Sequence, residues 1–167
     1  TNMNYVRAGN GLRIESNRIT LLNSHLNNMT TNGLVVSGSV PYKATGLLGK
    51  NCGAAGLDMG SSDVMSGSIK RIGMSNNLDD GLLVGISVLC DIRMSDIHAM
   101  NNVGYGISYS AKSPNIIKGL VTANNTVGTV DNSTGSLTLI NSLLQESTEF
   151  SGITAYTNKY IQSHRHD

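Results

Sequence analysis

The sequence contains few charged and few aromatic residues. Charged residues make up 14% of the 167 residues, aromatic residues 4%, and tryptophan is absent. Helical bundles and coiled coils need alanine, leucine, glutamate and lysine in quantity, so this composition is not typical of them. The formal net charge is only +1, and the sequence has no basic run. Because nucleic-acid binding usually requires concentrated positive charge, we expect no nucleic-acid partner.

Long apolar runs and closely spaced cysteines are also missing. No apolar run approaches the roughly 18 residues that a membrane-spanning helix needs, so we expect no membrane insertion. The two cysteines, Cys52 and Cys90, fall in different phases of the repeat described below, which predicts two buried free thiols. There is no Gly-x-Ser-x-Gly elbow, phosphate loop or His-Glu-x-x-His motif, and we expect no cofactor.

Glycine, asparagine and serine together make up about a third of the chain. Hydrophobic residues still account for 39% and are spread evenly, which excludes a disordered linker. The chain length fits one domain with a continuous core. This composition predicts an all-β fold of short strands and tight turns.

A glycine followed by an apolar or β-branched residue recurs every 22–25 residues. A polar turn that contains asparagine precedes most of these glycines, and another β-type stretch precedes each asparagine turn. The sequence therefore contains a repeated unit of two or three short strands. The glycines that mark the repeat are Gly11, Gly33, Gly56, Gly81, Gly106, Gly128 and Gly152.

A unit of about 23 residues cannot bury its own apolar face, so successive units must stack. Each strand then pairs in parallel with its equivalent about 4.8 Å away, around a narrow apolar interior. Alternation places Leu57 and Met59 inward and Asp58 outward. The repeated glycine suits a corner with positive φ. Asparagines at equivalent positions are expected to hydrogen-bond to one another along the stack.

The glycine and asparagine periods and the coil length resemble the right-handed parallel β-helix family, which includes pectate lyases, polysaccharide epimerases and phage tailspike depolymerases. The resemblance covers about residues 11–157 and implies roughly six coils of 22–25 residues. We expect a β-helix domain over 1–157, belonging to a longer chain, and a C-terminal tail over 158–167. A Greek-key sandwich is the rival all-β fold, but it does not explain the paired periods.

The resemblance implies three alternative functions. The first is the β-helical part of a phage tailspike or tail fibre in the virion tail, a homotrimer that binds bacterial surface polysaccharide during host attachment and can also degrade it. The second is a secreted polysaccharide lyase, epimerase or hydrolase. The third is a structural or adhesive shaft without catalysis. An enzyme of this kind would be a polysaccharide depolymerase.

Three carboxylates, Asp58, Asp79 and Asp80, are expected in neighbouring coils. Glycoside hydrolysis uses two carboxyl groups about 5–9 Å apart, which makes Asp58 and Asp80, with Asp79 beside them, the candidate catalytic residues. The same three residues are also suited to a Ca²⁺ site. The alternative is structural, because Asp-Asp-Gly is common in turns and an outward aspartate is simply solvated.

Lys70, Arg71 and Arg93 form a candidate substrate-binding group. In the lyases that this sequence resembles, a basic residue abstracts the proton α to a uronate carboxylate and cations neutralise that carboxylate. The expected alignment also places Arg71 over Asp96, where the two can form an ordinary ion pair between coils.

Tyr105 and Tyr109 flank a predicted strand and are candidate sugar-binding platforms, and Tyr42 lies in the connection from Ser37 to Thr45. An exposed tyrosine ring can stack on a sugar, but it can equally cover the core with its hydroxyl in water.

The histidines predict no metal site. His25 and His98 share a phase with Gly73 between them, and a separation of two coils, roughly 10 Å, is too large for one metal ion. His164 and His166 lie in a terminal segment that we expect to be solvated.

Overall fold

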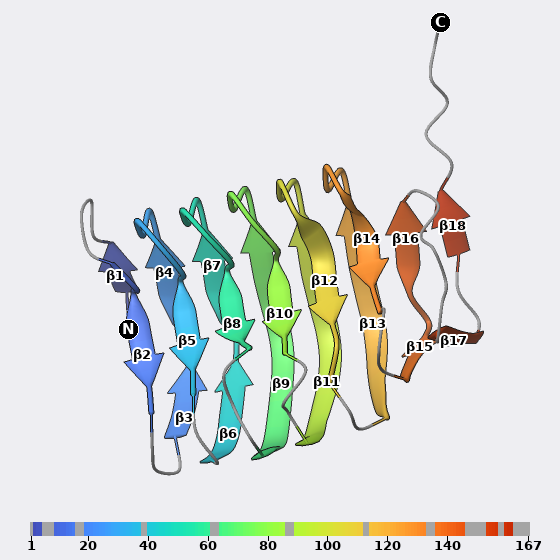
Figure 1. Ribbon diagram of the computed structural model, residues 1–167, viewed down its shortest axis with the longest axis horizontal. Helices are drawn as coiled ribbons and strands as arrows, with labels where there is room; N and C mark the ends of the chain where they lie inside the picture. Colours follow the sequence, from blue (N-terminus) through green and yellow to red (C-terminus); the bar gives the residue numbers. More distant parts are fainter. Residues whose placement is uncertain are drawn as a thin grey trace, which may run out of the picture.

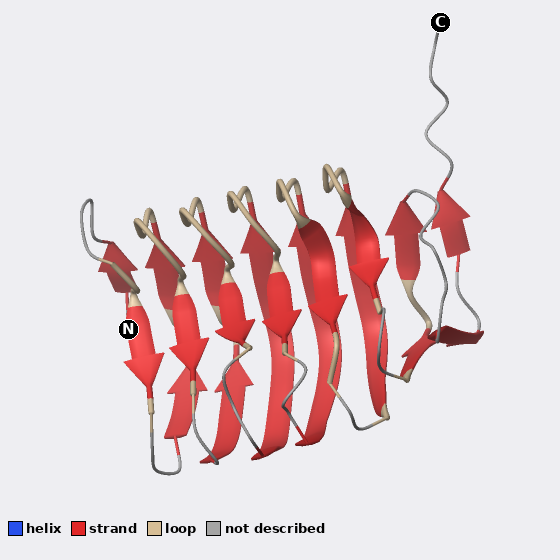
Figure 2. Ribbon diagram, in the orientation of Figure 1, coloured by secondary structure: helices blue, strands red, loops and turns tan. Residues whose placement is uncertain are grey.

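The computed structural model describes residues 2–4, 9–15, 19–37, 40–60, 64–85, 89–111, 114–132, 136–145, 153–156 and 159–161 (Figure 1). Every regular element in these ranges is a β-strand, and neighbouring strands pair in parallel (Figure 2). The chain winds into a right-handed β-helix of about five turns, slightly fewer than the sequence predicts. The predicted fold class is therefore confirmed.

The strands form two sheets. The six-stranded sheet contains β2 (Leu12–Ile14), β5 (Leu34–Val36), β8 (Leu57–Met59), β10 (Leu82–Val84), β12 (Tyr105–Tyr109) and β14 (Gly128–Asp131). The twelve-stranded sheet contains β1 (Asn2–Asn4), β3 (Ile19–Leu22), β4 (His25–Asn27), β6 (Val40–Thr45), β7 (Leu48–Lys50), β9 (Val64–Ser75), β11 (Leu89–Met100), β13 (Asn115–Ala123), β15 (Leu137–Ile140), β16 (Leu143–Gln145), β17 (Ile153–Tyr156) and β18 (Lys159–Ile161). Strand β18, within the segment predicted as a tail, pairs with β16.

One residue in each coil of the twelve-stranded sheet has a left-handed backbone conformation. In β9 and β11 it is Arg71 and Asp96, with φ of 55° and 54°. This left-handed residue interrupts the extended chain, and we call it the left-handed interruption. One extended segment precedes it and a second follows it in the twelve-stranded sheet, and a third lies in the six-stranded sheet. The residues of this column are Asn23, Gly46, Arg71, Asp96, Gly119 and Asn141.

Asparagine occupies a second left-handed column, at the turn that leads into the six-stranded sheet. Asparagine tolerates this conformation better than most residues because its short side chain can hydrogen-bond locally. The asparagine turns that the sequence predicts therefore have a conformational cause. The residues of this column are Asn28, Asn51, Asn76, Asn101 and Asn124.

The residue after each turn asparagine forms a buried amide ladder. The Asn77 side-chain amide donates to Asn102 Oδ1 at 2.9 Å, and the Asn102 amide donates to Asn125 Oδ1 at 2.9 Å. Each of these oxygens also accepts the backbone N–H one coil earlier, so Asn77 N donates to Asn102 Oδ1 at 3.1 Å. The predicted hydrogen bonding of asparagines along the stack is confirmed.

Cys52 occupies the next position of this ladder. Its thiol is buried and unpaired with another cysteine, and Sγ donates to the Leu26 carbonyl at 3.7 Å. That carbonyl is equivalent to the Gly49 carbonyl, which accepts from the Asn77 amide. The thiol therefore replaces the amide as a donor but supplies no matching amide oxygen. The Cys90 side chain lies outside the described residues.

The repeated glycines are required by close packing and not by positive φ, which corrects the expected reason for them. A Cβ at Gly33 would lie 2.6 Å from the Gly56 carbonyl oxygen, and one at Gly81 would lie 2.6 Å from that of Gly106. Neither glycine has positive φ. The sixth predicted glycine is displaced by one residue, because Gly128 pairs with Tyr105. The turn itself keeps its length, so Thr129 takes the position over Gly106.

The interior is filled by inward side chains of every coil. Leu57 and Met59 are fully buried and Asp58 between them is only half-buried, as alternation predicts. Burial of the apolar core provides the main driving force for stacking. The glycine contacts and the amide ladder then fix which residue lies above which.

Replacement of Asn102 by alanine (Asn102→Ala) should lower the free energy of unfolding by roughly 3 kcal/mol, because it leaves buried polar groups of both neighbouring coils without partners. Chemical denaturation would measure the change. Asn101→Gly is the matched control, since Asn101 is exposed and left-handed, and it should change stability little. Equal effects of the two substitutions would contradict a special role for the ladder.

Cys52→Asn should extend the ladder by one coil and raise the free energy of unfolding by about 1 kcal/mol. The new amide oxygen would accept the Met29 N–H, as Asn77 accepts that of Cys52 at 3.0 Å. Thermal unfolding of parent and variant under reducing conditions would test this. A lower melting temperature would show that the site cannot accommodate the larger amide.

Candidate functional site

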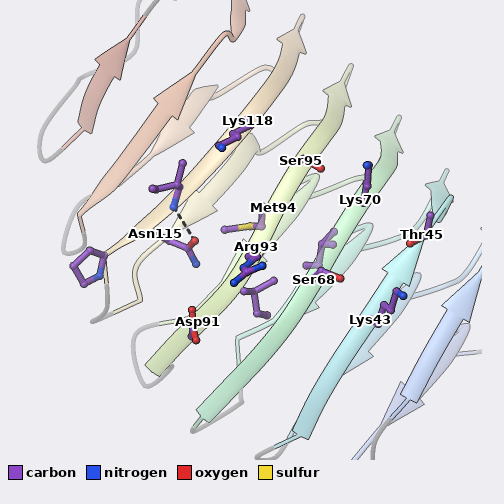
Figure 3. Close-up of a pocket in the computed structure, with 14 residues that line it drawn as sticks. Lys43, Thr45, Ser68, Lys70, Asp91, Arg93, Met94, Ser95, Asn115 and Lys118 are labelled. Atoms are coloured by element: carbon purple, nitrogen blue, oxygen red, sulfur yellow. Dashed lines mark hydrogen bonds between the residues drawn. The ribbon is translucent and has the colours of Figure 1, made fainter.

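A hollow lies on the outward side of β6, β9, β11 and β13, before the left-handed interruption. Its volume is about 600 Å³. Figure 3 shows side chains from these four strands around it. We call this surface the basic face, for its four cations Lys43, Lys70, Arg93 and Lys118.

The strand register places these cations in two rows. Lys43 aligns with Ser68, and Ser68 aligns with Arg93. Two residues further along the strands, Lys70 and Lys118 flank Ser95 in the same way. Each of four successive coils therefore contributes one positive charge, alternately to one row and to the other.

The cations point into solvent and are not neutralised by partners. All four side chains are exposed, and none takes part in an ion pair in the described part of the chain. Asp91 is the one carboxylate among the residues that line the hollow. The basic face therefore produces a positive potential that favours an extended polyanion.

Neutral groups lie between the cations. Thr45, Ser68 and Ser95 supply hydroxyl groups, and Asn115 supplies an amide. The Asn115 oxygen accepts from the Ile116 backbone at 2.7 Å (Figure 3), and the Ile116 side chain is 46% exposed. A sugar ring presents hydroxyl groups at its edge and C–H groups on its faces. Hydrogen-bonding side chains next to an apolar side chain can contact both.

The predicted basic group is divided by the structure. Lys70 and Arg93 lie together on the basic face, but Arg71 lines a separate hollow of about 320 Å³ with Asp96 and His98. The sequence analysis missed Lys43 and Lys118, which complete the rows. Their spacing in the sequence could have indicated them, because Lys43 precedes Lys70, and Lys118 follows Arg93, by about one coil.

Arg71 does align with Asp96, as predicted, because the flanking residues pair Lys70 with Ser95 and Ile72 with Ile97. No ion pair joins them among the described residues. Both residues are exposed at the left-handed interruption, and Ser95 Oγ donates to the Asp96 carboxylate at 3.5 Å.

The Asp58 carboxylate is held by hydrogen bonds near the corner of the coil. Oδ1 accepts from Gly60 N at 2.7 Å, and Oδ2 accepts from the Asn32 amide at 3.1 Å. Asp58 comes from β8 of the six-stranded sheet, not from the basic face. The neighbouring Asp79 side chain is exposed at the turn before β10.

Asp80 occupies the position before a repeated glycine, which Asn32 and Ala55 hold in the two coils before it. Its Oδ1 accepts from Tyr105 N at 2.7 Å, just as Asn32 Oδ1 accepts from Ala55 N at 2.9 Å. Asp80 is 9% exposed. Burial raises the pKa of its carboxyl from 3.8 to about 6; the Tyr105 hydrogen bond lowers this pKa, and the charges of Asp79 and Asp131 raise it.

The candidate tyrosines differ in position. Tyr109 is completely buried, so its ring packs in the core and away from the surface. Tyr105 is half-buried at the start of β12. Tyr42 lies in β6 with 1% exposure, and burial raises the pKa of its hydroxyl, which has no hydrogen-bond partner among the described residues. None of the three lines the basic face.

His25 and His98 share one outward row, with Leu48 and Gly73 between them. They are three coils apart, one more than the sequence predicts. No group of three or more His, Cys, Asp or Glu residues that could hold a metal ion occurs in the described ranges. His164 and His166 lie outside those ranges.

Comparison with family models, curated proteins and solved structures gives no match for this chain. Over the described residues, no helix is long and apolar enough to cross a membrane. The chain is thus assigned to an architectural class, the parallel β-helix proteins.

Asp80→Asn should stabilise the protein by about 1 kcal/mol at neutral pH. The folded-state pKa of Asp80 lies above 3.8, so the folded state retains the proton longer and parent stability falls as pH rises from about 4 to above 6. A pKa shift of this size would correspond to roughly 3 kcal/mol of stability for a group fully shielded from solvent. Asp80 is partly screened by solvent, so we expect a smaller gain.

The amide of Asp80→Asn keeps an oxygen that can accept from Tyr105 N, so the hydrogen bond is retained. Because the amide does not titrate, the fall in stability between about pH 4 and above pH 6 should be absent from the variant. Urea denaturation at about pH 4.5 and pH 7.5 would measure it. An identical pH dependence in parent and variant would exclude Asp80 as its source.

Proposed function

We propose that the protein binds an acidic polysaccharide along the basic face, as a tailspike-type appendage would bind bacterial surface polysaccharide during host attachment. The observation that carries this proposal is the repeated placement of one exposed cation on each of four successive coils. A charged polymer that lies along the β-helix axis can contact all four at once.

The spacing supports an extended sugar chain as the ligand. Successive coils lie about 4.8 Å apart, which is close to the length of one sugar residue in an extended chain. Lys43 and Arg93 lie in one row, and Lys70 and Lys118 lie in the other. A chain whose acid groups alternate from side to side presents the same pattern.

The neutral side chains on the basic face add contacts that a simple polyanion would not use. Hydroxyl groups of Thr45, Ser68 and Ser95 can exchange hydrogen bonds with sugar hydroxyls. Each contact is weak, and affinity arises from repetition along the polymer.

Elimination is a second candidate function, favoured by the presence of Lys70 and Arg93 in the same hollow. One of these groups would abstract the proton α to a uronate carboxylate while the other neutralises that carboxylate. The electron pair of the broken C–H bond forms a C4–C5 double bond, the C4–O glycosidic bond breaks, and a water molecule protonates the leaving oxygen. An unsaturated sugar product, detected by its ultraviolet absorbance, would support a lyase. Binding without product would support an adhesive shaft.

Lys70→Ala and Arg93→Ala should each weaken binding of an immobilised polyuronate by about two- to fivefold, because each removes one exposed ion pair. Arg71→Ala is the matched control: it removes a cation adjacent in sequence that lies in a different hollow. Biosensor titration of oligouronates at low and moderate salt would measure the effects.

Salt should weaken the parent more than the variants. A similar loss of affinity in Arg71→Ala would show that net charge, and not the basic face, determines binding. Equal affinity for a neutral glucan would also contradict the proposal.

A further inference from the structure

Gly73 leaves a gap in an outward row of side chains on β7, β9 and β11, after the left-handed interruption. The register places Leu48 on one side of this gap and His98 on the other. Two adjoining hollows of about 320 and 290 Å³ lie at the gap, and all three residues line both of them. We call the pair the glycine hollow. Each part lies near the lower end of the roughly 300–1,000 Å³ that small-ligand pockets occupy.

In the part of the chain that the structure describes, no contact requires glycine at position 73. A Cβ at Gly33 or Gly81 would meet a backbone oxygen at 2.6 Å, and Gly46 has a φ of 69°. Gly73 has neither property, because its φ is not positive and a Cβ there would meet, within 4 Å, only a terminal methyl group of Leu48. Glycine inside a strand weakens the strand and often marks a place where a ligand approaches closely. The gap is therefore suited to an external group.

The two neighbours of the gap can enclose a flat ring. Leu48 is 41% exposed and supplies an aliphatic surface, and the exposed His98 supplies an imidazole ring. A ring that stands over Gly73 lies about one coil spacing, roughly 4.8 Å, from each of them, which is a contact distance for ring faces. The C–H groups on the faces of a sugar ring match this environment.

Hydrogen-bonding groups lie beside the gap. Arg71 and Asp96 line one part of the glycine hollow, both are exposed, and no ion pair joins them among the described residues. The guanidinium donates and the carboxylate accepts, so together they match sugar hydroxyl groups, which do both. Because their charges are opposite, they favour a neutral sugar over a second acidic one. Lys50 and Ser75 add donors at the other part.

The glycine hollow lies across the left-handed interruption from the basic face. Lys70 lines the basic face, whereas the next residue, Arg71, lines the glycine hollow, and Ser95 and Asp96 are divided in the same way. Three residues lead from Lys70 to Gly73, which corresponds to at most about 10 Å of extended chain. Two sugar units span a similar length, so a short branch of a polymer on the basic face can reach the gap.

We propose that the glycine hollow binds one neutral sugar ring, the outer unit of a two-sugar branch that projects from the polymer on the basic face. The ring stands over Gly73 between Leu48 and His98, and its hydroxyl groups exchange hydrogen bonds with Arg71 and Asp96. The ligand of the proposed function is then a branched acidic polysaccharide, so the branch rests on that function.

Gly73→Val should weaken the binding of a neutral sugar at least about tenfold, because the valine side chain occupies the place of the ring. The strand should tolerate the change, since valine favours strands and only the end of the flexible Leu48 side chain must move. Gly9→Val is the matched control. Gly9 is exposed before β2, and a Cβ there would meet only Thr31 Oγ1, at 3.9 Å. Circular dichroism would show that both variants are folded.

NMR titration with the methyl glycosides of glucose, galactose, mannose and N-acetylglucosamine would measure this binding. At least one glycoside should give saturable shifts of the backbone amide signals of Leu48 and His98, with a dissociation constant in the millimolar range. These shifts should persist in Gly9→Val. No saturable shift with any of the four glycosides, or equal effects of the two substitutions, would overturn the proposal.

The branch is tested with two oligouronates of equal length, one of which carries a two-sugar branch that ends in the hexose that binds. The parent should bind the branched oligomer about three- to tenfold more tightly, and Gly73→Val should bind both with the affinity of the parent for the unbranched one. Equal affinity of the parent for the two oligomers would overturn the branch. Glycoside binding at Leu48 and His98 without binding of either oligomer would overturn the proposed function and support the sugar site.

Discussion

The hydrogen bonds between successive coils are the constraint on which the rest of the structure depends. The buried amides of Asn77, Asn102 and Asn125 satisfy backbone groups at the turn and lock each coil to the next. Because register is then fixed, any outward residue that recurs once per coil becomes part of a straight row. The basic face results from this repetition, although its residues are far apart in the sequence.

The sequence predicts the fold well because glycine and asparagine mark its period, and each of these residues suits only a few backbone environments. The asparagine turns could be predicted from the left-handed preference of asparagine, and the structure confirms them. The cause of the glycine period was less accessible, because the contact between Gly33 and the Gly56 carbonyl exists only after stacking. A count of residues likewise could not show that Thr129, and not Gly128, lies over Gly106.

The structure brings together only part of the predicted basic group, for a reason that lies in the backbone. Simple alternation predicts that adjacent residues point to opposite sides, yet Lys70 and Arg71 are both exposed. The left-handed conformation of Arg71 breaks the alternation and places the two cations in different hollows. Lys43 and Lys118 join Lys70 only through the register of separate coils. Composition alone also hides the basic face, because a net charge of +1 says nothing about its distribution.

The carboxylates show how the same scaffold assigns polar residues to structure or to surface. Asp80 takes the place that Asn32 occupies two coils earlier and accepts an equivalent backbone hydrogen bond, so its charge is buried where an amide would serve. The basic face, by contrast, carries four cations that form no ion pair with any described residue. An extended polymer along the β-helix axis would contact these exposed charges on four successive coils at once. Weak contacts per coil would thereby add up to firm attachment without any deep pocket.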